Sequence, residues 1–401
     1  MLVFKLKVVL IVSLLAASTQ VLAEGIIDLK PYVITSINHD DNLFRLSSKQ
    51  QAIAVLGSEN MADTVARLQV GADLNLRLSR QLFQVTTSIN ADKYSRFNNL
   101  DNTGNNLGLR WDWRFGNDVY GILSANKRKS IAGFDQTRTA VKNVTTLDRQ
   151  TASINWDFHP DWTLFLNSER YNFINEAISS VQLDREDKII ETGLRFTSPL
   201  DTQLAISYRI VDASFANRTG LLKTILGSKN SQKELVFTAA WLVAPKTRIS
   251  TRISKVNLSR DDSLLTDFSG LNQRWMLDYS ASAKLNFNMA VFQVLSPIDD
   301  VATTYVKQTG FEINPTWNFS SKVALRANLS YLESAFIGSE RFIAGQQQRQ
   351  DASTQASLSL IYAPTIKSQL QLQYTGEKRN STIENAGYQF NNLNFLVRYD
   401  F

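Results

Sequence analysis

The chain contains no cysteine and has only two histidines and seven prolines among its 401 residues. Without cysteine it can form neither disulfide bonds nor a thiolate metal site. Beyond the N-terminal segment, no apolar run approaches the roughly 18 residues that a membrane-spanning helix requires. Linkers rich in Pro, Gly or Ser and blocks of like charge are also missing, so the sequence predicts one undivided domain.

The charge balance and the mean hydropathy further limit the class of protein to which the chain can belong. Lys and Arg number 43 against 37 Asp and Glu, which gives a formal net charge of +6. The basic residues are scattered rather than gathered into tracts, so nucleic acid is not an expected partner. The mean hydropathy is −0.19. Such an average disagrees with a helical membrane protein but agrees with a membrane β-barrel, in which every second residue faces lipid and the others face water.

The first 23 residues have the layout of a secretory signal peptide. Lys5 and Lys7 provide a positive start, Val8 to Ala17 an apolar core, and Val21-Leu22-Ala23 a cleavage site. We therefore expect residues 1–23 to be removed and residues 24–401 to form the mature domain. The alternative is an uncleaved N-terminal anchor.

Polar and apolar residues alternate along much of the chain, which is the pattern of strands with two different faces. The pattern is clearest from Leu68 to Leu78, from Leu107 to Phe115 and from Leu393 to Phe401. Weaker alternation covers Ala152–Phe158, Ile190–Phe196, Leu204–Ile210, Leu235–Val243, Phe311–Phe319, Val323–Tyr331, Thr354–Tyr362 and Ile366–Tyr374. A soluble β-sandwich alternates too. However, segments near the 9–11 residues of a spanning strand, with Trp and Tyr at their ends, favour a membrane barrel.

Short turns recur about 40 residues apart, which is a hairpin-sized spacing. The predicted turns are Ser79-Arg80-Gln81, Gly116-Asn117-Asp118, His159-Pro160-Asp161, Ser198-Pro199-Leu200-Asp201, Ala244-Pro245-Lys246, Ser282-Ala283-Lys284, Ser320-Ser321-Lys322 and Ala363-Pro364-Thr365. Longer polar stretches separate them: Asn38–Met61, Asn98–Asn106, Arg128–Asn143, Asn172–Asp187, Asn217–Lys233, Ser259–Asn272, Ser296–Tyr305, Phe336–Arg349 and Glu377–Gly387. Short turns on one side and long loops on the other are typical of an outer-membrane barrel, whose short turns are periplasmic.

The turns also set the number of strands. Eight turns flank 16 strands, and Pro31–Ile37 and Tyr388–Phe401 add one strand at each end. The expected fold is therefore an all-β, closed, antiparallel outer-membrane barrel of 18 strands. A barrel of 16 strands is the alternative, because Tyr120–Asn126 and Leu285–Val294 alternate poorly and Pro31–Ile37 is short.

Charged residues on the face opposite the apolar one are expected to line the lumen, because charge is costly on the lipid face. The candidates are Arg67, Asp73, Arg77, Arg110, Asp112, Arg114, Glu191, Arg195, Arg209, Arg248, Arg252, Arg274, Asp278, Glu312, Arg326 and Arg398. Their mixed signs favour a solvated wall stiffened by ion pairs. The alternative is an electrostatic path for anionic solutes, since rings of Arg and Lys suit anion pores.

Little in the sequence indicates catalysis. His39 lies in the first long loop and His159 in a short turn, and no phosphate-binding loop or metal-protease motif occurs. We expect neither an enzyme nor a cofactor or metal site. The carboxylates of His39-Asp40-Asp41-Asn42 suggest a cation site, but their spacing fits no calcium loop, so an ordered loop cap is the preferred interpretation.

Several segments together resemble a known family. Pro31-Tyr32-Val33, the stretch Asp41-Asn42-Leu43-Phe44-Arg45-Leu46, the Ala-Pro-Lys-like turns and the aromatic last strand resemble the EpsL-like outer-membrane proteins, which belong to a wider group of β-barrel porins. Two turns, Ser282-Ala283-Lys284 and Ser320-Ser321-Lys322, depart from the pattern because they lack proline. The resemblance extends over the whole mature chain and supplies no catalytic residue. It implies a conduit that assists exopolysaccharide export in a Gram-negative bacterium, with polysaccharide and other proteins of the export locus as partners.

Two alternatives to export remain open at this stage. One is a general or anion-biased porin for small solutes, and the other is an outer-membrane enzyme or a barrel that binds partners through its loops. A TonB-dependent transporter is disfavoured, because no plug-sized segment precedes the first strand. In each case we expect an outer-membrane location, with membrane lipid and the outer-membrane assembly machinery as partners. Tyr399 and Phe401 end the last strand in a way that resembles the signal read by that machinery.

Overall fold

The computed structural model describes residues 27–261, 263–297, 303–338 and 348–401. The predicted signal peptide, residues 1–23, lies outside these ranges, and so do parts of the predicted loops Ser296–Tyr305 and Phe336–Arg349.

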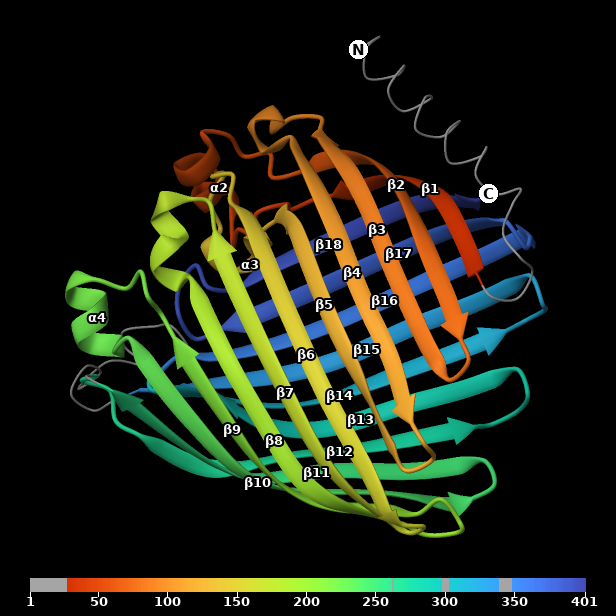
Figure 1. Cartoon of the computed structure of the whole chain (residues 1–401). Coiled ribbons are helices and arrows are strands. Elements are labelled where there is room, and N and C mark those ends of the chain that lie inside the picture. Colours follow the sequence, from red (N-terminus) through yellow and green to blue (C-terminus); the bar gives the residue numbers. More distant parts are fainter. Residues whose placement is uncertain (1–26, 262, 298–302, 339–347) are drawn as a thin grey trace.

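Within these ranges the chain forms a single antiparallel sheet of 18 strands (Figure 1). The strands are β1 (Ile27–Asp40), β2 (Asp63–Leu78), β3 (Gln81–Tyr94), β4 (Asn102–Phe115), β5 (Val119–Ile131), β6 (Val144–His159), β7 (Trp162–Asn175), β8 (Arg185–Thr197), β9 (Gln203–Ser214), β10 (Lys229–Ala244), β11 (Thr247–Asp261), β12 (Phe268–Ser280), β13 (Leu285–Ser296), β14 (Tyr305–Asn318), β15 (Val323–Ile337), β16 (Gln350–Thr365), β17 (Ser368–Ser381) and β18 (Tyr388–Asp400).

The sheet is closed on itself. Each strand pairs with the next along the chain, and β1 pairs with both β2 and β18. Closure meets the demand of lipid, in which every backbone N–H and C=O must find a partner inside the protein. The prediction of 18 strands is therefore confirmed and the alternative of 16 is wrong. The weakly alternating segments Tyr120–Asn126 and Leu285–Val294 lie within β5 and β13.

Several strands extend further into the predicted long loops than the sequence indicated. β1 runs from Ile27 to Asp40 rather than from Pro31 to Ile37, and β4 begins at Asn102, inside the predicted loop Asn98–Asn106. Near the long loops the strands rise above the lipid, so an outward polar residue such as His39 meets water there. The ladder can therefore continue without the apolar alternation that made the spanning part recognisable.

One predicted turn is misplaced. The turn between β16 and β17 is Ile366-Lys367, and Ala363 to Thr365 form the end of β16. The β16–β17 register shifts between Tyr362 and Thr365, on either side of Pro364. Proline cannot donate a ladder hydrogen bond, so within a sheet it occupies edges and bulges as well as turns. The proline marked a bulge here, whereas the other turns lie at or within one residue of their predicted positions.

Short helices occupy the long loops: α2 (Lys49–Leu56), η2 (Asn98–Leu100), α3 (Phe134–Thr137), η3 (Ile178–Leu183) and α4 (Gly220–Leu226). The labelled helices α2, α3 and α4 gather at the end of the barrel away from the short turns (Figure 1). Phe44, Leu46 and Leu100 are almost completely buried there and form an apolar cluster beneath the loops. Among the described residues no helix has the length and apolarity to cross a membrane.

Candidate pore lining

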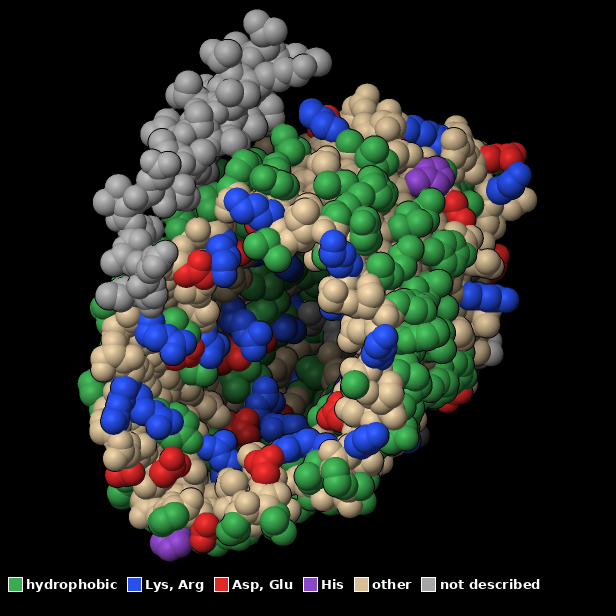
Figure 2. Space-filling view, turned by 90° about the vertical axis from the view of Figure 1, so that its right-hand side faces the viewer, with side chains coloured by type: hydrophobic (Ala, Val, Ile, Leu, Met, Phe, Trp, Pro, Cys, Tyr) green, Lys and Arg blue, Asp and Glu red, His purple; other side chains and the backbone are tan. Residues whose placement is uncertain are grey.

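Alternation along the strands gives the barrel an apolar outer face and a polar inner face. Leu107, Leu109 and Leu123 project outward and leave 42–48% of their surface exposed. Figure 2 views the end that carries the short turns. It shows a hollow lined with Lys, Arg, Asp and Glu side chains, and an outer surface that is largely hydrophobic. The charged face predicted from the sequence therefore surrounds a hollow interior.

One charged row crosses three neighbouring strands of the inner wall. Arg209 on β9 lies directly opposite Glu191 on β8 and Glu234 on β10. Its guanidinium donates to Glu234 and lies 3.9 Å from a carboxylate oxygen of Glu191. Ser207 Oγ donates to Glu191 at 2.7 Å, and Gln232 Nε2 donates to Glu234 at 2.8 Å. Both carboxylates are thus held in place around a single guanidinium.

Two further arginines continue this wall and are less completely neutralised. Arg252 on β11 and Arg274 on β12 occupy directly opposite positions. Arg252 lies 3.5 Å from Glu191 and Arg274 lies 3.0 Å from Glu312. Their side chains remain 42% and 39% exposed. Together with Arg209 and Glu191 they line a hollow of about 680 Å³ in the inner wall.

A second group of candidates lies across the barrel, near the closing strands. The guanidinium of Arg398 bonds to Asp400 at 2.7 Å, lies 3.7 Å from Asp73, and stacks 4.2 Å from the ring centre of Tyr32. Further toward the long loops, Arg67 bonds to the buried Asp92 at 2.6 Å. These pairs fit the interpretation of a stiffened wall, because each charge has an opposite charge beside it.

The remaining candidates have local partners or lie near strand ends. Arg77 is next to the turn that follows β2, and Arg326 is opposite Ser359 on β16. The other contacts are Arg110 with Asp112 (2.7 Å), Arg114 over the ring of Tyr120 (4.8 Å), Arg195 donating to Asn155 (3.2 Å), Arg248 with Asp201 (2.6 Å), and Asp278 accepting from Asn288 (2.6 Å). That each of these residues takes part in solute passage stays a prediction.

Another sector of the inner wall is polar but uncharged, and the sequence reasoning did not single it out. On β16, β17 and β18, two cross-strand rows run along inner positions, Ser357–Thr375–Asn392 and Ser359–Gln373–Asn394. Gln371 Nε2 donates to Gln373 Oε1 at 3.2 Å in the same sector. Because strands follow chain order around the barrel, this amide and hydroxyl wall faces the charged wall across the lumen.

Glu234 and Asp92 are two of the acidic residues of the inner face that the sequence reasoning missed. Glu234 is only 4% exposed and Asp92 only 2%, and both are paired with arginines that were predicted. A signal for Glu234 was present, because it immediately precedes Leu235, the first outward residue of a predicted strand. No alternating segment was recognised over β3, so Asp92 had no predicted face.

The acidic motif of the first loop serves as a loop cap. The carboxylate of Asp40 accepts two hydrogen bonds from Arg45, at 2.8 and 2.9 Å. The carboxylate of Asp41 accepts from the backbone and the side-chain amide of Asn391, at 2.7 and 2.8 Å. The guanidinium of Arg45 also stacks 3.4 Å from the ring centre of Phe390. The motif therefore fastens the first loop to β18, and no group of potential metal ligands gathers among the described residues.

The two histidines are far apart. His39 Nδ1 bonds to Thr64 Oγ1 at 2.9 Å near the long loops, whereas His159 lies at a short turn, 3.9 Å from Asp161. A shared catalytic arrangement of the two is thus ruled out by their placement at opposite ends of the strands.

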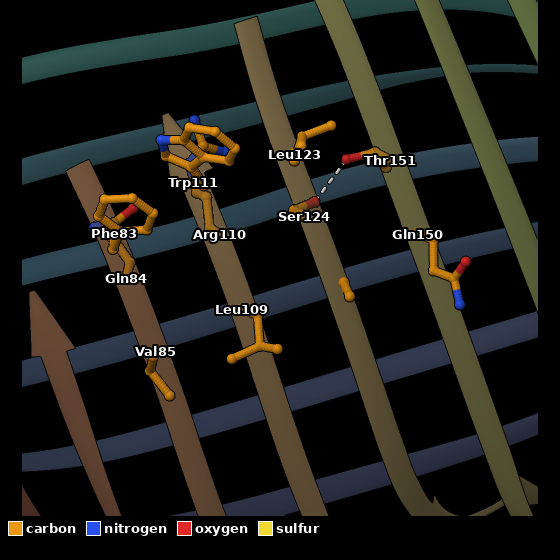
Figure 3. Close-up of a pocket in the computed structure, with 11 residues that line it drawn as sticks. Phe83, Gln84, Val85, Leu109, Arg110, Trp111, Leu123, Ser124, Gln150 and Thr151 are labelled. Carbon is orange, nitrogen blue, oxygen red and sulfur yellow. Dashed lines mark hydrogen bonds between the residues drawn. The ribbon is translucent and has the colours of Figure 1, made fainter. Parts of the chain in front are cut away.

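An apolar groove lies on the outer face (Figure 3). Phe83 and Trp111 stack with ring centres 5.4 Å apart, and with Val85, Leu109 and Leu123 they line a hollow of about 500 Å³. These five side chains occupy outward positions on β3, β4 and β5. The groove accordingly opens toward lipid and not toward the lumen.

Several solved structures of bacterial proteins have a similar fold. OccAB3 of Acinetobacter baumannii has a TM-score of 0.52 and 11% identity, covering 93% of this chain and 99% of that chain. OccK2 of Pseudomonas aeruginosa, solved in complex with glucuronate, has 0.51 and 9%, covering 93% and 98%. A BenF-like porin of Pseudomonas fluorescens has 0.51 and 10%, covering 93% and 99%. No family model and no curated protein matches the sequence.

Similarity at so low an identity shows a shared fold. A closed antiparallel barrel with an apolar outer face is the fold of proteins that cross the outer membrane with strands. The predicted outer-membrane location is therefore confirmed. The coarser part of the predicted family relationship, a porin-like barrel, also agrees with these structures.

Proposed function

We propose that the protein is a passive outer-membrane channel for small water-soluble solutes, with a preference for anions. The observation that carries the proposal is the pair Arg252 and Arg274, which lie directly opposite each other on β11 and β12. Like charges in directly opposite positions repel each other. An anion held between the two guanidiniums relieves that repulsion.

The surroundings of this pair suit passage rather than tight binding. Each arginine also has a carboxylate within 3.5 Å, Glu191 or Glu312, which weakens its attraction for a passing anion. A conducting site must bind strongly enough to admit a solute and weakly enough to release it. The names of two similar structures, a porin and a complex with the carboxylate sugar glucuronate, support a solute channel of this kind.

Planar-bilayer recording tests the proposal. We expect discrete conductance steps from the purified barrel and a reversal potential in a KCl gradient that indicates chloride preference. Replacing both arginines, Arg252→Gln with Arg274→Gln, should move the reversal potential toward cation preference. Glu234→Gln should move it the other way, because Arg209 then loses its buried counter-charge.

Arg170→Gln is the control for a charge change outside the lumen, since it removes a guanidinium from the outer face of β7 and leaves the lumen unchanged. A protein that inserts but gives no conductance would overturn the channel itself. Conductance with the same reversal potential in every variant would overturn the anion preference alone.

Export of an exopolysaccharide is the narrower role implied by the resemblance to EpsL-like proteins. None of the similar structures supports it, so passage of small solutes is the better-supported function. The alternative of an outer-membrane enzyme is not supported by the two histidines, which lie at opposite ends of the strands. Among the loop residues that the structure describes, no specific contact favours a binding role.

A further inference from the structure

Basic side chains encircle the outer face of the barrel near the long loops. We call this set the outer basic belt: Lys93, Lys127, Arg170, Lys188, Lys233, Lys255, Lys307 and Lys378, on strands β3, β5, β7, β8, β10, β11, β14 and β17. All eight side chains are exposed. None belongs to the lumen wall described above.

The strand register places these cations on the lipid side. Lys255 lies directly opposite Leu235 and Leu271, which are outward residues with 55% and 44% of their surface exposed. Lys127 lies opposite the outward Leu107. The other members stand two or four residues along their strands from outward residues, such as Lys188 from Ile190, so alternation gives them the same face.

The belt also has a defined height. On β7, Arg170 is eight residues from Trp162 at the short-turn end, and on β14, Lys307 is ten residues from Trp317. At a rise of about 3.4 Å per residue and a tilt near 40°, eight to ten residues climb roughly 21–26 Å. The apolar band of an outer-membrane barrel is about 25 Å tall. The cations therefore stand where the apolar band gives way to lipid headgroups.

Charge on the outer face begins at this level and continues toward the long loops, where the outward Lys129 pairs with Glu176 and Lys229 lies opposite Asp261. Along the described strands, outward positions between the belt and the short turns carry no Lys, Arg, Asp or Glu. Four acids share the level of the belt: Asp148, Glu186, Asp212 and Glu333. Eight cations against four acids leave an excess of positive charge.

Pairing within the belt leaves several cations available. Glu186 lies 2.7 Å from Arg170 and 3.9 Å from Lys188, which oppose each other across β7 and β8. Lys93 bonds to Asp101 at 2.6 Å. No ion pair to Lys233 or Lys255 occurs within the part of the chain that the structure describes. These two are diagonal neighbours on β10 and β11. Such neighbours lie about 7–8 Å apart, and their Cβ atoms somewhat closer, so two flexible ammonium groups can meet on one anion.

We infer that the outer basic belt binds phosphate groups carried by lipids of the outer leaflet. Lysine stems can lie along apolar surface while the ammonium group reaches the headgroup level. A phosphate monoester offers three acceptor oxygens and close to two negative charges at neutral pH. Lysines at the membrane surface are attracted to anionic lipid headgroups, so several acting together give a specific lipid contact.

The experiment compares two lipids that differ only in phosphate. The purified full-length barrel is placed in micelles containing either bis-phosphorylated lipid A or the same lipid after phosphatase treatment. The midpoint of thermal unfolding is read from gel mobility and tryptophan fluorescence. We expect the phosphorylated lipid to raise the midpoint by several degrees over the dephosphorylated one. High salt should reduce the rise because exposed charges are screened.

The variant Lys233→Gln/Lys255→Gln/Lys307→Gln should lose about half of that rise or more. The control Lys246→Gln/Lys322→Gln/Lys367→Gln removes the same charge from the periplasmic turns and should keep all of it. Inorganic phosphate without lipid should give no rise, which separates a lipid-borne phosphate from a free one. If the triple variant fails to fold, the single variants Lys233→Gln and Lys233→Arg are compared instead. We expect the arginine variant to keep the full rise in the unfolding midpoint and the glutamine variant to lose part of it.

An equal rise for both lipids, or an unchanged rise in the belt variants, would overturn the inference. Neither result would affect the proposed channel, because belt residues do not line the lumen.

Discussion

Glu234 and Arg209 illustrate what a single residue contributes to the inner wall. Glu234 lies on the lumen side of β10 but is only 4% exposed. Desolvating a carboxylate is costly unless an opposite charge and further hydrogen bonds compensate it. Arg209 and Gln232 provide both. Alternation in the sequence assigned Arg209 to the inner face. Its pairing with Glu234 follows from the β9–β10 register. That register cannot be predicted from the alternation of residues along either strand.

A residue-scale prediction concerns pH. Asp201 lies in the turn between β8 and β9, outside the spanning strands, and the Arg248 guanidinium holds the pKa of that carboxyl below its usual 3.8. A carboxyl with a depressed pKa adds stability above its unfolded pKa, and that stability is lost as pH falls through the folded value. Arg248→Gln should therefore raise the pKa of Asp201 toward 3.8 and remove its contribution at neutral pH.

Titration of the carboxyl by NMR measures this shift. Asp161, in the preceding turn, is the control, because Arg248 does not contact it. An unchanged titration of Asp201 in the variant would contradict the assignment of Arg248 as the cause.

At the scale of the elements, the first loop shows how a local motif depends on tertiary structure. Its residues Asp40 and Arg45 form an ion pair whose side chains are 3% and 17% exposed, and Asp41 binds Asn391 of β18. These contacts lie where β1 closes the barrel against β18. The sequence identified the stretch and favoured a loop cap, but the segment that the loop caps lies about 350 residues away and became known only from the closed sheet.

Breaking this contact should destabilise the barrel. Arg45→Ala leaves the buried carboxylate of Asp40 without its counter-charge, and we expect a loss of about 3 kcal/mol in the free energy of unfolding. Amide exchange should accelerate at the β1–β18 end and not near β8. Urea unfolding and exchange mass spectrometry measure the two effects.

The control for this variant is Lys49→Ala. Lys49 pairs with Glu59, but the two side chains are 70% and 58% exposed. An exposed pair contributes at most about 1 kcal/mol. Equal destabilisation by the two variants would mean that the loop contact does not hold the closing strands.

At the scale of the whole molecule, we expect insertion into the membrane and stability of the folded barrel to be separable. Tyr399 and Phe401 project outward at the end of the chain, 42% and 38% exposed, with ring centres 5.2 Å apart. The backbone N–H of Phe401 donates to Pro31 O, a bond that a side-chain substitution keeps. The role of the two rings as an assembly signal stays a prediction.

Phe401→Ala should therefore lower the amount of barrel assembled in the outer membrane several-fold while changing the unfolding midpoint of the assembled fraction little. Heat-modifiable gel mobility of membrane fractions measures assembly, and refolding into detergent measures intrinsic stability. Phe115→Ala, another exposed ring near the short turns on β4, is the control. Normal assembly of the Phe401 variant would contradict the signal role.

The sequence by itself determined the class of fold, the strand count, most turns and the inner face of the charged residues predicted to line the pore. These features follow from local alternation and turn chemistry, which act over two to four residues. Tertiary structure decided the rest. The opposition of Arg252 and Arg274, the burial of Glu234, the height of the outer basic belt and the fastening of the first loop to β18 all depend on register and closure. Register aligns residues far apart in the chain, and a local pattern holds no information about that alignment.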